Sequence, residues 1–139
     1  MKKLNRERVN NLLAGIAQFG KTEKGITRLA YSEEDFAAQK WLLDQVKDLD
    51  LKVTEDAIGN LILRREGRHA DWAPVAMGSH LDTVTQGGAY DGVLGVVGAL
   101  EVMYMLQDEQ LDRPLELIIF RAEESTRFGF ATIGSKIMA

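Results

Sequence analysis

The sequence predicts an α/β fold, a partial mixed sheet with helices on both faces, and three observations lead to this prediction. Two short apolar runs, 74–78 and 115–120, have the length and composition of buried strands. A longer apolar stretch rich in small residues, 92–106, lies between them and reads as a buried helix. Strand, helix and strand in this order form a right-handed crossover, which makes the two strands parallel neighbours.

The first half of the chain supplies two further helices and two further strands. Apolar residues recur at helical spacing over 9–19, which predicts an opening amphipathic helix. A second helix is predicted over about 33–48, because Ser32 can cap it and acidic residues fill its first turn. The runs 51–55 and 60–64 alternate as half-buried strands do, and they extend the sheet.

The composition excludes several classes of protein. The 139 residues suffice for one domain, and the net charge of −4 gives no general attraction to nucleic acid or to an anionic membrane. There is no cysteine, which excludes disulfides and thiolate metal sites. The first residues carry charges where a signal peptide needs an apolar core, and no apolar run is long enough to span a bilayer. We therefore expect a cytoplasmic protein.

One histidine and four carboxylates follow the strand ends of this frame. His80 and Asp82 follow the first parallel strand, and Glu123 and Glu124 follow the second. Asp91 begins the intervening helix, which returns from the same edge of the sheet. Open α/β sheets bind ligands outside the carboxyl ends of their strands, so these segments are expected to converge on one spot.

These side chains together can build a metal site and its general base. A metal-bound imidazole at His80 would donate its other N–H to a group such as the Asp82 carboxylate. Asp91 can bridge two metal ions, each oxygen binding one of them. Of the adjacent Glu123 and Glu124, one can bind a metal while the other removes a proton from water.

Each of these residues also has an ordinary structural interpretation. A lone histidine is more often a structural or surface residue than a ligand. Asp91 lies among glycines, as turn residues do, and the pair of glutamates could be a solvated helix cap. The order in which all five occur favours the metal site over the separate structural roles.

The assembled chain resembles the N-carbamoyl-amino-acid hydrolase and allantoate amidohydrolase branch of the dinuclear zinc exopeptidase superfamily. Matches in a fixed order are far more specific than any one motif. The similar segments extend over nearly the whole chain, at 27–32, 57–61, 78–95, 122–128 and 134–136.

The resemblance implies a role for each residue of the site. His80 would be a ligand of the first metal, with Asp82 as the partner that orients it. Asp91 would bridge two divalent ions, with a cis peptide bond after it, and Glu124 would bind the second ion. Glu123 would be the catalytic base that activates water. The metals would be zinc, manganese, cobalt or nickel, and the bond cleaved would be the carbamoyl or ureido C–N bond of N-carbamoyl amino acids or allantoate.

The resemblance also implies parts that residues 1–139 do not supply. Related enzymes take further histidine ligands from later in the chain, and an arginine of a lid domain binds the substrate carboxylate. We therefore expect residues 1–139 to be the N-terminal portion of the catalytic domain of a homodimeric parent enzyme, without the lid and dimerisation domain and inactive alone. No substrate-binding residue can be named. Two alternatives remain open, a non-catalytic remnant or interaction module, and a peptidase or N-acyl amidase of the same superfamily.

Overall fold

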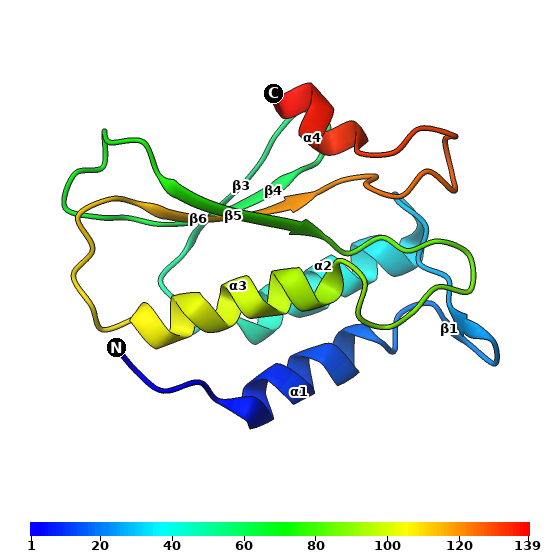
Figure 1. Ribbon diagram of the computed structural model, residues 1–139, viewed down its shortest axis with the longest axis horizontal. Helices are drawn as coiled ribbons and strands as arrows, with labels where there is room; N and C mark the ends of the chain where they lie inside the picture. Colours follow the sequence, from blue (N-terminus) through cyan, green and yellow to red (C-terminus); the bar gives the residue numbers. More distant parts are fainter.

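A four-stranded mixed sheet forms the centre of the computed structural model, which describes residues 1–139 (Figure 1). The strand order is β3 (Lys52–Glu55), β4 (Leu61–Arg65), β6 (Leu115–Phe120) and β5 (Val75–His80). β5 and β6 are parallel, whereas β4 is antiparallel to both β3 and β6. The predicted α/β class and mixed sheet are confirmed, and each predicted strand lies within two residues of its observed position.

Three long helices cover one face of the sheet, and only one short helix lies on the other (Figure 1). The predicted placement of helices on both faces of the sheet is therefore confirmed, although the two faces are covered unequally. The reason is visible in β6, where Leu115, Leu117 and Ile119 are buried beneath the helices and the residues between them are only half-buried. The helices are α1 (Arg6–Ile16), α2 (Glu33–Gln45), α3 (Val93–Leu106) and the short α4 (Ile133–Met138), and a small hairpin is formed by β1 (Lys21–Thr22) and β2 (Gly25–Ile26).

The strand β5 also differs from expectation. It was predicted to be covered on both faces, but it lies at the edge of the sheet, and Val75 is 54% exposed. Its last residue, His80, is buried. The strand is therefore most protected at the end that carries the candidate site.

The first two helices, α1 and α2, begin where the sequence offers capping side chains. The Asn5 side chain accepts a hydrogen bond from the Arg8 N–H at the start of α1, and Ser32 accepts one from the Asp35 N–H at the start of α2. The central helix α3 is apolar almost throughout, and most of its residues are buried between α1 and the sheet.

No helix combines the length and the apolar character that crossing a bilayer would need.

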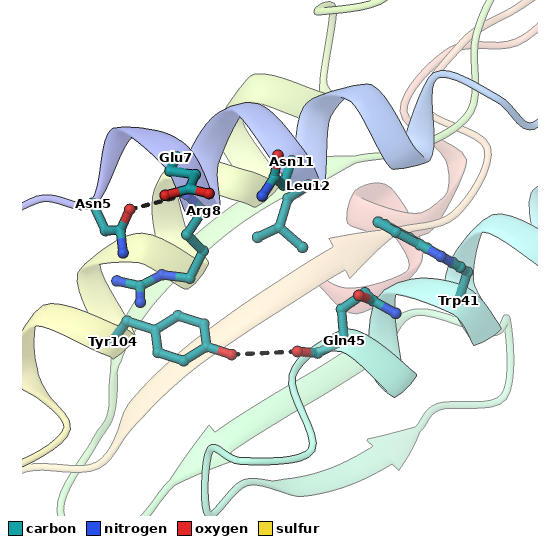
Figure 2. A pocket seen from close by; sticks show the side chains of 8 residues that line it. All are labelled: Asn5, Glu7, Arg8, Asn11, Leu12, Trp41, Gln45 and Tyr104. Carbon is teal, nitrogen blue, oxygen red and sulfur yellow. Dashed lines mark hydrogen bonds between the residues drawn. The ribbon is translucent and has the colours of Figure 1, made fainter.

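A partly buried ion pair, with Glu101 buried and the Arg8 side chain 27% exposed, joins α1 to the middle of α3. The Arg8 Nε lies 2.8 Å from Glu101 Oε2, and the Asn5 N–H donates to Glu101 Oε1 over 2.7 Å. The guanidinium also lies over the Tyr104 ring, 4.0 Å from its centroid. Figure 2 shows Asn5, Arg8 and Tyr104 along a cavity of about 330 Å³ between the helices. This polar cluster lies apart from the strand ends and holds the helical layer together.

The Glu101 ion pair makes part of the stability depend on pH. Burial raises the pKa of Glu101, but the bonds from Arg8 and Asn5 outweigh burial, so the pKa lies below its ordinary value of 4.5. A carboxylate with a lowered pKa stabilises the fold above its unfolded pKa, and this contribution is lost as the pH falls through the folded pKa. We expect Glu101→Gln to lower the free energy of unfolding by about 1–2 kcal/mol at neutral pH, and by less in acid. Urea unfolding at about pH 7 and about pH 3.5 measures this, and an equal difference at both would contradict it.

Candidate metal centre

The predicted site residues lie where β5 and β6 end, at one edge of the sheet. The parallel register continues to His80 opposite Phe120, so the residues that follow these two positions leave the sheet side by side. One ligand atom each of His80, Glu123 and Glu124 lies within 4.8 Å of the others. The predicted convergence of the two strand ends is therefore present in the structure.

The imidazole of His80 is buried and held in one orientation. Its Nδ1 lies 3.0 Å from the backbone carbonyl oxygen of Asp82. A carbonyl oxygen can only accept, so Nδ1 carries the hydrogen and Nε2 keeps its lone pair. Nε2 faces Glu123 Oε2 at 3.6 Å and Asp91 Oδ1 at 4.0 Å. It is therefore the ring atom that can bind a metal.

The backbone at Gly92 leaves room for that ring. Gly92 has a φ of +65°, and a Cβ built there would lie 2.5 Å from His80 Cε1 and Nε2. Any other residue would fill the space beside the ligand atom. The cis peptide implied after Asp91 is wrong, since no peptide bond in the chain is cis. The chain instead turns into α3 through the positive φ of Gly92.

Asp82 makes different contacts from those predicted. Its Oδ1 lies 3.6 Å from His80 Nδ1, which is too long for a hydrogen bond. The carboxylate instead accepts the backbone N–H groups of Glu123, over 3.3 Å, and Glu124, over 2.9 Å. Asp82 is 2% exposed. It therefore orients the imidazole through its carbonyl oxygen, while its side chain ties the end of β5 to the turn after β6.

The two glutamates lie in a tight turn that begins at Ala122. Ala122 is buried and has a φ of 49°, in the left-handed region. After this residue the N–H groups of Glu123 and Glu124 both point at Asp82. Burial raises the pKa of Glu124, and the charge of Glu123 raises it further. A cation between these carboxylates would relieve both effects.

Asp91 lies beside this trio rather than within it. Its side chain is 75% exposed, and Oδ1 lies 4.0 Å from His80 Nε2. Its position is set by the turn into α3, two residues before the helix begins at Val93. A carboxylate at this distance can reach a cation held at Nε2, and its bridging role stays a prediction.

Sequence reasoning missed two buried arginines that hold the strand ends. Arg28 is fully buried, and its Nε donates to the Leu81 carbonyl, over 2.8 Å, between two predicted site residues. Arg121 is buried directly before the glutamate turn and pairs with Asp35 over 2.6 Å. The sequence contained one signal for Arg121: it follows directly after an apolar strand, and a charged side chain that is buried there needs a partner of opposite charge.

The donor set fits a divalent transition-metal ion. An imidazole nitrogen and several carboxylate oxygens suit zinc, manganese, cobalt and nickel. The fixed tautomer of His80 and the bonds that orient the glutamate turn are the supporting contacts that such sites use. The edge of the sheet is therefore chemically competent to hold a metal.

Comparison with known proteins agrees with this arrangement. The model of peptidase family M28 matches residues 60–139. An uncharacterized hydrolase of Haemophilus influenzae is 45% identical over 97% of this chain and 33% of its own length. An N-carbamoyl-L-amino acid amidohydrolase of Geobacillus stearothermophilus is 39% identical over 96% of this chain and 33% of its own. The crystal structure of a hydantoinase/carbamoylase family amidase from Burkholderia ambifaria is similar with a TM-score of 0.92 and 39% identity, over 97% of this chain and 34% of that one. The chain spans about a third of the length of these relatives.

Proposed function

The chain belongs to peptidase family M28, and from this premise we propose that it carries part of the active site of a metal-dependent amidohydrolase. The proposed reaction is cleavage of the carbamoyl or ureido C–N bond of N-carbamoyl amino acids or allantoate. One observation carries the proposal, the approach of His80, Glu123 and Glu124 to within 4.8 Å at the ends of two parallel strands. The N-carbamoyl-L-amino acid amidohydrolase among the relatives supports the substrate class. Because the chain spans a third of these relatives, the activity is proposed for the whole protein.

The proposed metal ligands follow from the direction of each side chain. We propose that His80, through Nε2, and the carboxylates of Glu124 and Asp91 would hold two divalent ions, with the exposed Asp91 carboxylate as the shared ligand. Two divalent ions in such a site supply Lewis acidity, which lowers the pKa of water and polarises the bond to be cleaved. Zinc, manganese, cobalt and nickel all suit these ligands.

Glu123 is the proposed general base. Its backbone is tied to Asp82, and its Oε2 lies 3.6 Å from the ring nitrogen assigned to the metal. The carboxylate is thus held beside the site, where it can take a proton from the attacking water and return it to the departing nitrogen. The balanced outcome is that a ureido group and one water give an amine, ammonia and carbon dioxide. Asp82 supports this step by fixing both the imidazole and the glutamate turn.

We place the complete protein in the cytoplasm as a homodimer. The lack of cysteine in residues 1–139 agrees with a reducing compartment. The dimer rests on the resemblance alone, and light scattering of the product of the complete open reading frame measures it directly.

The product of the complete open reading frame is the form in which the reaction is to be tested. We expect ammonia release from an N-carbamoyl amino acid or from allantoate that stops when a chelator removes the metal and resumes when Mn²⁺ or Zn²⁺ is added. A dipeptide and an N-acetyl amino acid serve as matched controls and are expected to remain intact. Cleavage of either control in place of the ureido compounds would assign the protein to a different activity. Ammonia release that survives complete metal removal would overturn the metal mechanism.

A further inference from the structure

We propose that the buried ion pair of Asp35 and Arg121 is a positioning device for the candidate metal centre. It would fix the turn that presents the two glutamates after β6, without binding a metal or the substrate itself. The consequence for metal affinity rests on the proposed function, whereas the consequence for the turn does not.

The guanidinium of Arg121 is bound by three acceptors from two other segments. Nη1 donates to Asp35 Oδ2 over 2.6 Å and Nη2 donates to Gln39 Oε1 over 2.6 Å, both on α2. Nε donates to the Gly59 carbonyl over 2.9 Å, in the turn between β3 and β4. The side chains of Arg121 and Asp35 are 3% and 2% exposed. The planar guanidinium is therefore held against α2 in one geometry.

The backbone of Arg121 is fixed as firmly as its side chain. Its N–H donates to Asn60 Oδ1 over 2.8 Å, and its carbonyl accepts the Gly134 N–H over 2.9 Å. Asn60 is fully buried, and its Nδ2 donates to Asp56 Oδ2 over 2.7 Å and to the Gly134 carbonyl over 3.0 Å. Arg121, the residue before the glutamate turn, is thus hydrogen-bonded to neighbouring segments through its side chain and through both of its backbone groups.

The fixed position of Arg121 is passed on to the two glutamates through a single residue. Ala122 takes the left-handed conformation, and its carbonyl accepts the Ile133 N–H over 3.0 Å. The Glu123 carbonyl accepts the Thr132 N–H over 2.7 Å. A metal site tolerates ligand displacements of only about 0.2 Å, so a small rotation at Arg121 would misplace the carboxylates.

Stability alone is a weak explanation for this ion pair. Burying two charges costs desolvation free energy that their mutual attraction barely offsets. Replacing such a pair with apolar residues of similar volume often leaves the protein equally stable. The chain contains a second, partly buried ion pair, Arg8 with Glu101, which joins α1 to α3 and lies apart from the strand ends. This second pair is the natural control, because breaking it lowers stability without touching the glutamate turn.

The test compares Asp35→Asn with Glu101→Gln in the product of the complete open reading frame by two measurements. Native-state amide hydrogen exchange measures the exchange rates of the Glu123 and Glu124 N–H groups, which donate to Asp82. These rates are compared with those of the amides in β6. Titration with Zn²⁺ reads metal affinity. We expect Asp35→Asn to speed exchange at the two glutamates about tenfold relative to β6 and to weaken Zn²⁺ binding about tenfold. Glu101→Gln is expected to change all amides together and to leave Zn²⁺ affinity unchanged.

The proposal is overturned if Asp35→Asn behaves as Glu101→Gln does in both measurements. Should Asp35→Asn fail to fold, Gln39→Leu decides, because Gln39 holds both members of the ion pair: its Oε1 accepts from Arg121 Nη2 over 2.6 Å and its Nε2 donates to Asp35 Oδ1 over 3.1 Å. Faster exchange confined to the two glutamates in that variant supports the proposal, and unchanged exchange overturns it. If the unaltered product of the complete open reading frame binds no Zn²⁺, the proposed function loses its metal centre, and the exchange rates still decide the positioning role.

Discussion

Replacing Glu123 with glutamine in the product of the complete open reading frame is expected to lower kcat by about 10²–10⁴-fold and to leave the bound metal in place. A general base contributes an acceleration of this size, and a glutamine side chain cannot take a proton. The substitution keeps the size of the side chain and the backbone N–H that donates to Asp82. Ammonia release at saturating substrate gives kcat, and elemental analysis of the purified variant gives its metal content.

Glu124→Gln is the matched control for this experiment. It alters the neighbouring carboxylate, which we assign to the metal, so metal content is expected to fall together with turnover. The distinction matters because both glutamates approach His80 closely in the structure. Full turnover by Glu123→Gln would remove its role as the base, and loss of metal in that variant would make Glu123 a ligand.

Asp82→Asn in the product of the complete open reading frame is expected to weaken Zn²⁺ binding about 10–100-fold and to lower the free energy of unfolding by about 2 kcal/mol. The buried carboxylate uses both of its oxygens, one for each N–H of the glutamate turn. Asparagine offers one oxygen, and its amide group would face the other N–H. Zinc titration and urea unfolding of the same preparation measure the two effects.

Asp91→Asn separates the loss of a metal ligand from the loss of structure. The Asp91 side chain is 75% exposed, so its replacement is expected to change the free energy of unfolding by less than about 0.5 kcal/mol. Zinc affinity is expected to fall all the same, because the carboxylate that we propose as the bridge between two ions is removed. Unchanged affinity in Asp82→Asn would contradict the positioning role of that residue, and unchanged affinity in Asp91→Asn would contradict the bridge.

The parallel half of the fold could be predicted because its signals are local. Two apolar runs and the helix between them imply a crossover, and β5, α3 and β6 lie where the spacing puts them. The antiparallel pairing of β4 with β6 could not be predicted, because it joins residues such as Leu63 and Leu117 that are far apart in the sequence. This pairing leaves β5 at the edge of the sheet and Val75 exposed.

The members of the candidate site were readable from the sequence, but their contacts were not. His80 and the two glutamates follow strand ends, which a periodicity argument can locate. The hydrogen bonds from the glutamate turn to Asp82 depend on the left-handed conformation of Ala122. No pattern of residue types in the sequence predicts this conformation. The partner of Arg121 likewise lies 86 residues away along the chain.

The position of bound metal tests the central claim most directly. Crystals of the product of the complete open reading frame, grown with Zn²⁺ or Mn²⁺, give anomalous difference peaks that locate the ions. We predict one peak about 2.0–2.1 Å from His80 Nε2 and a second about 2.0–2.2 Å from a Glu124 carboxylate oxygen, with Asp91 bound to both. Metal bound elsewhere in the crystal, with none at the ends of β5 and β6, would contradict the account.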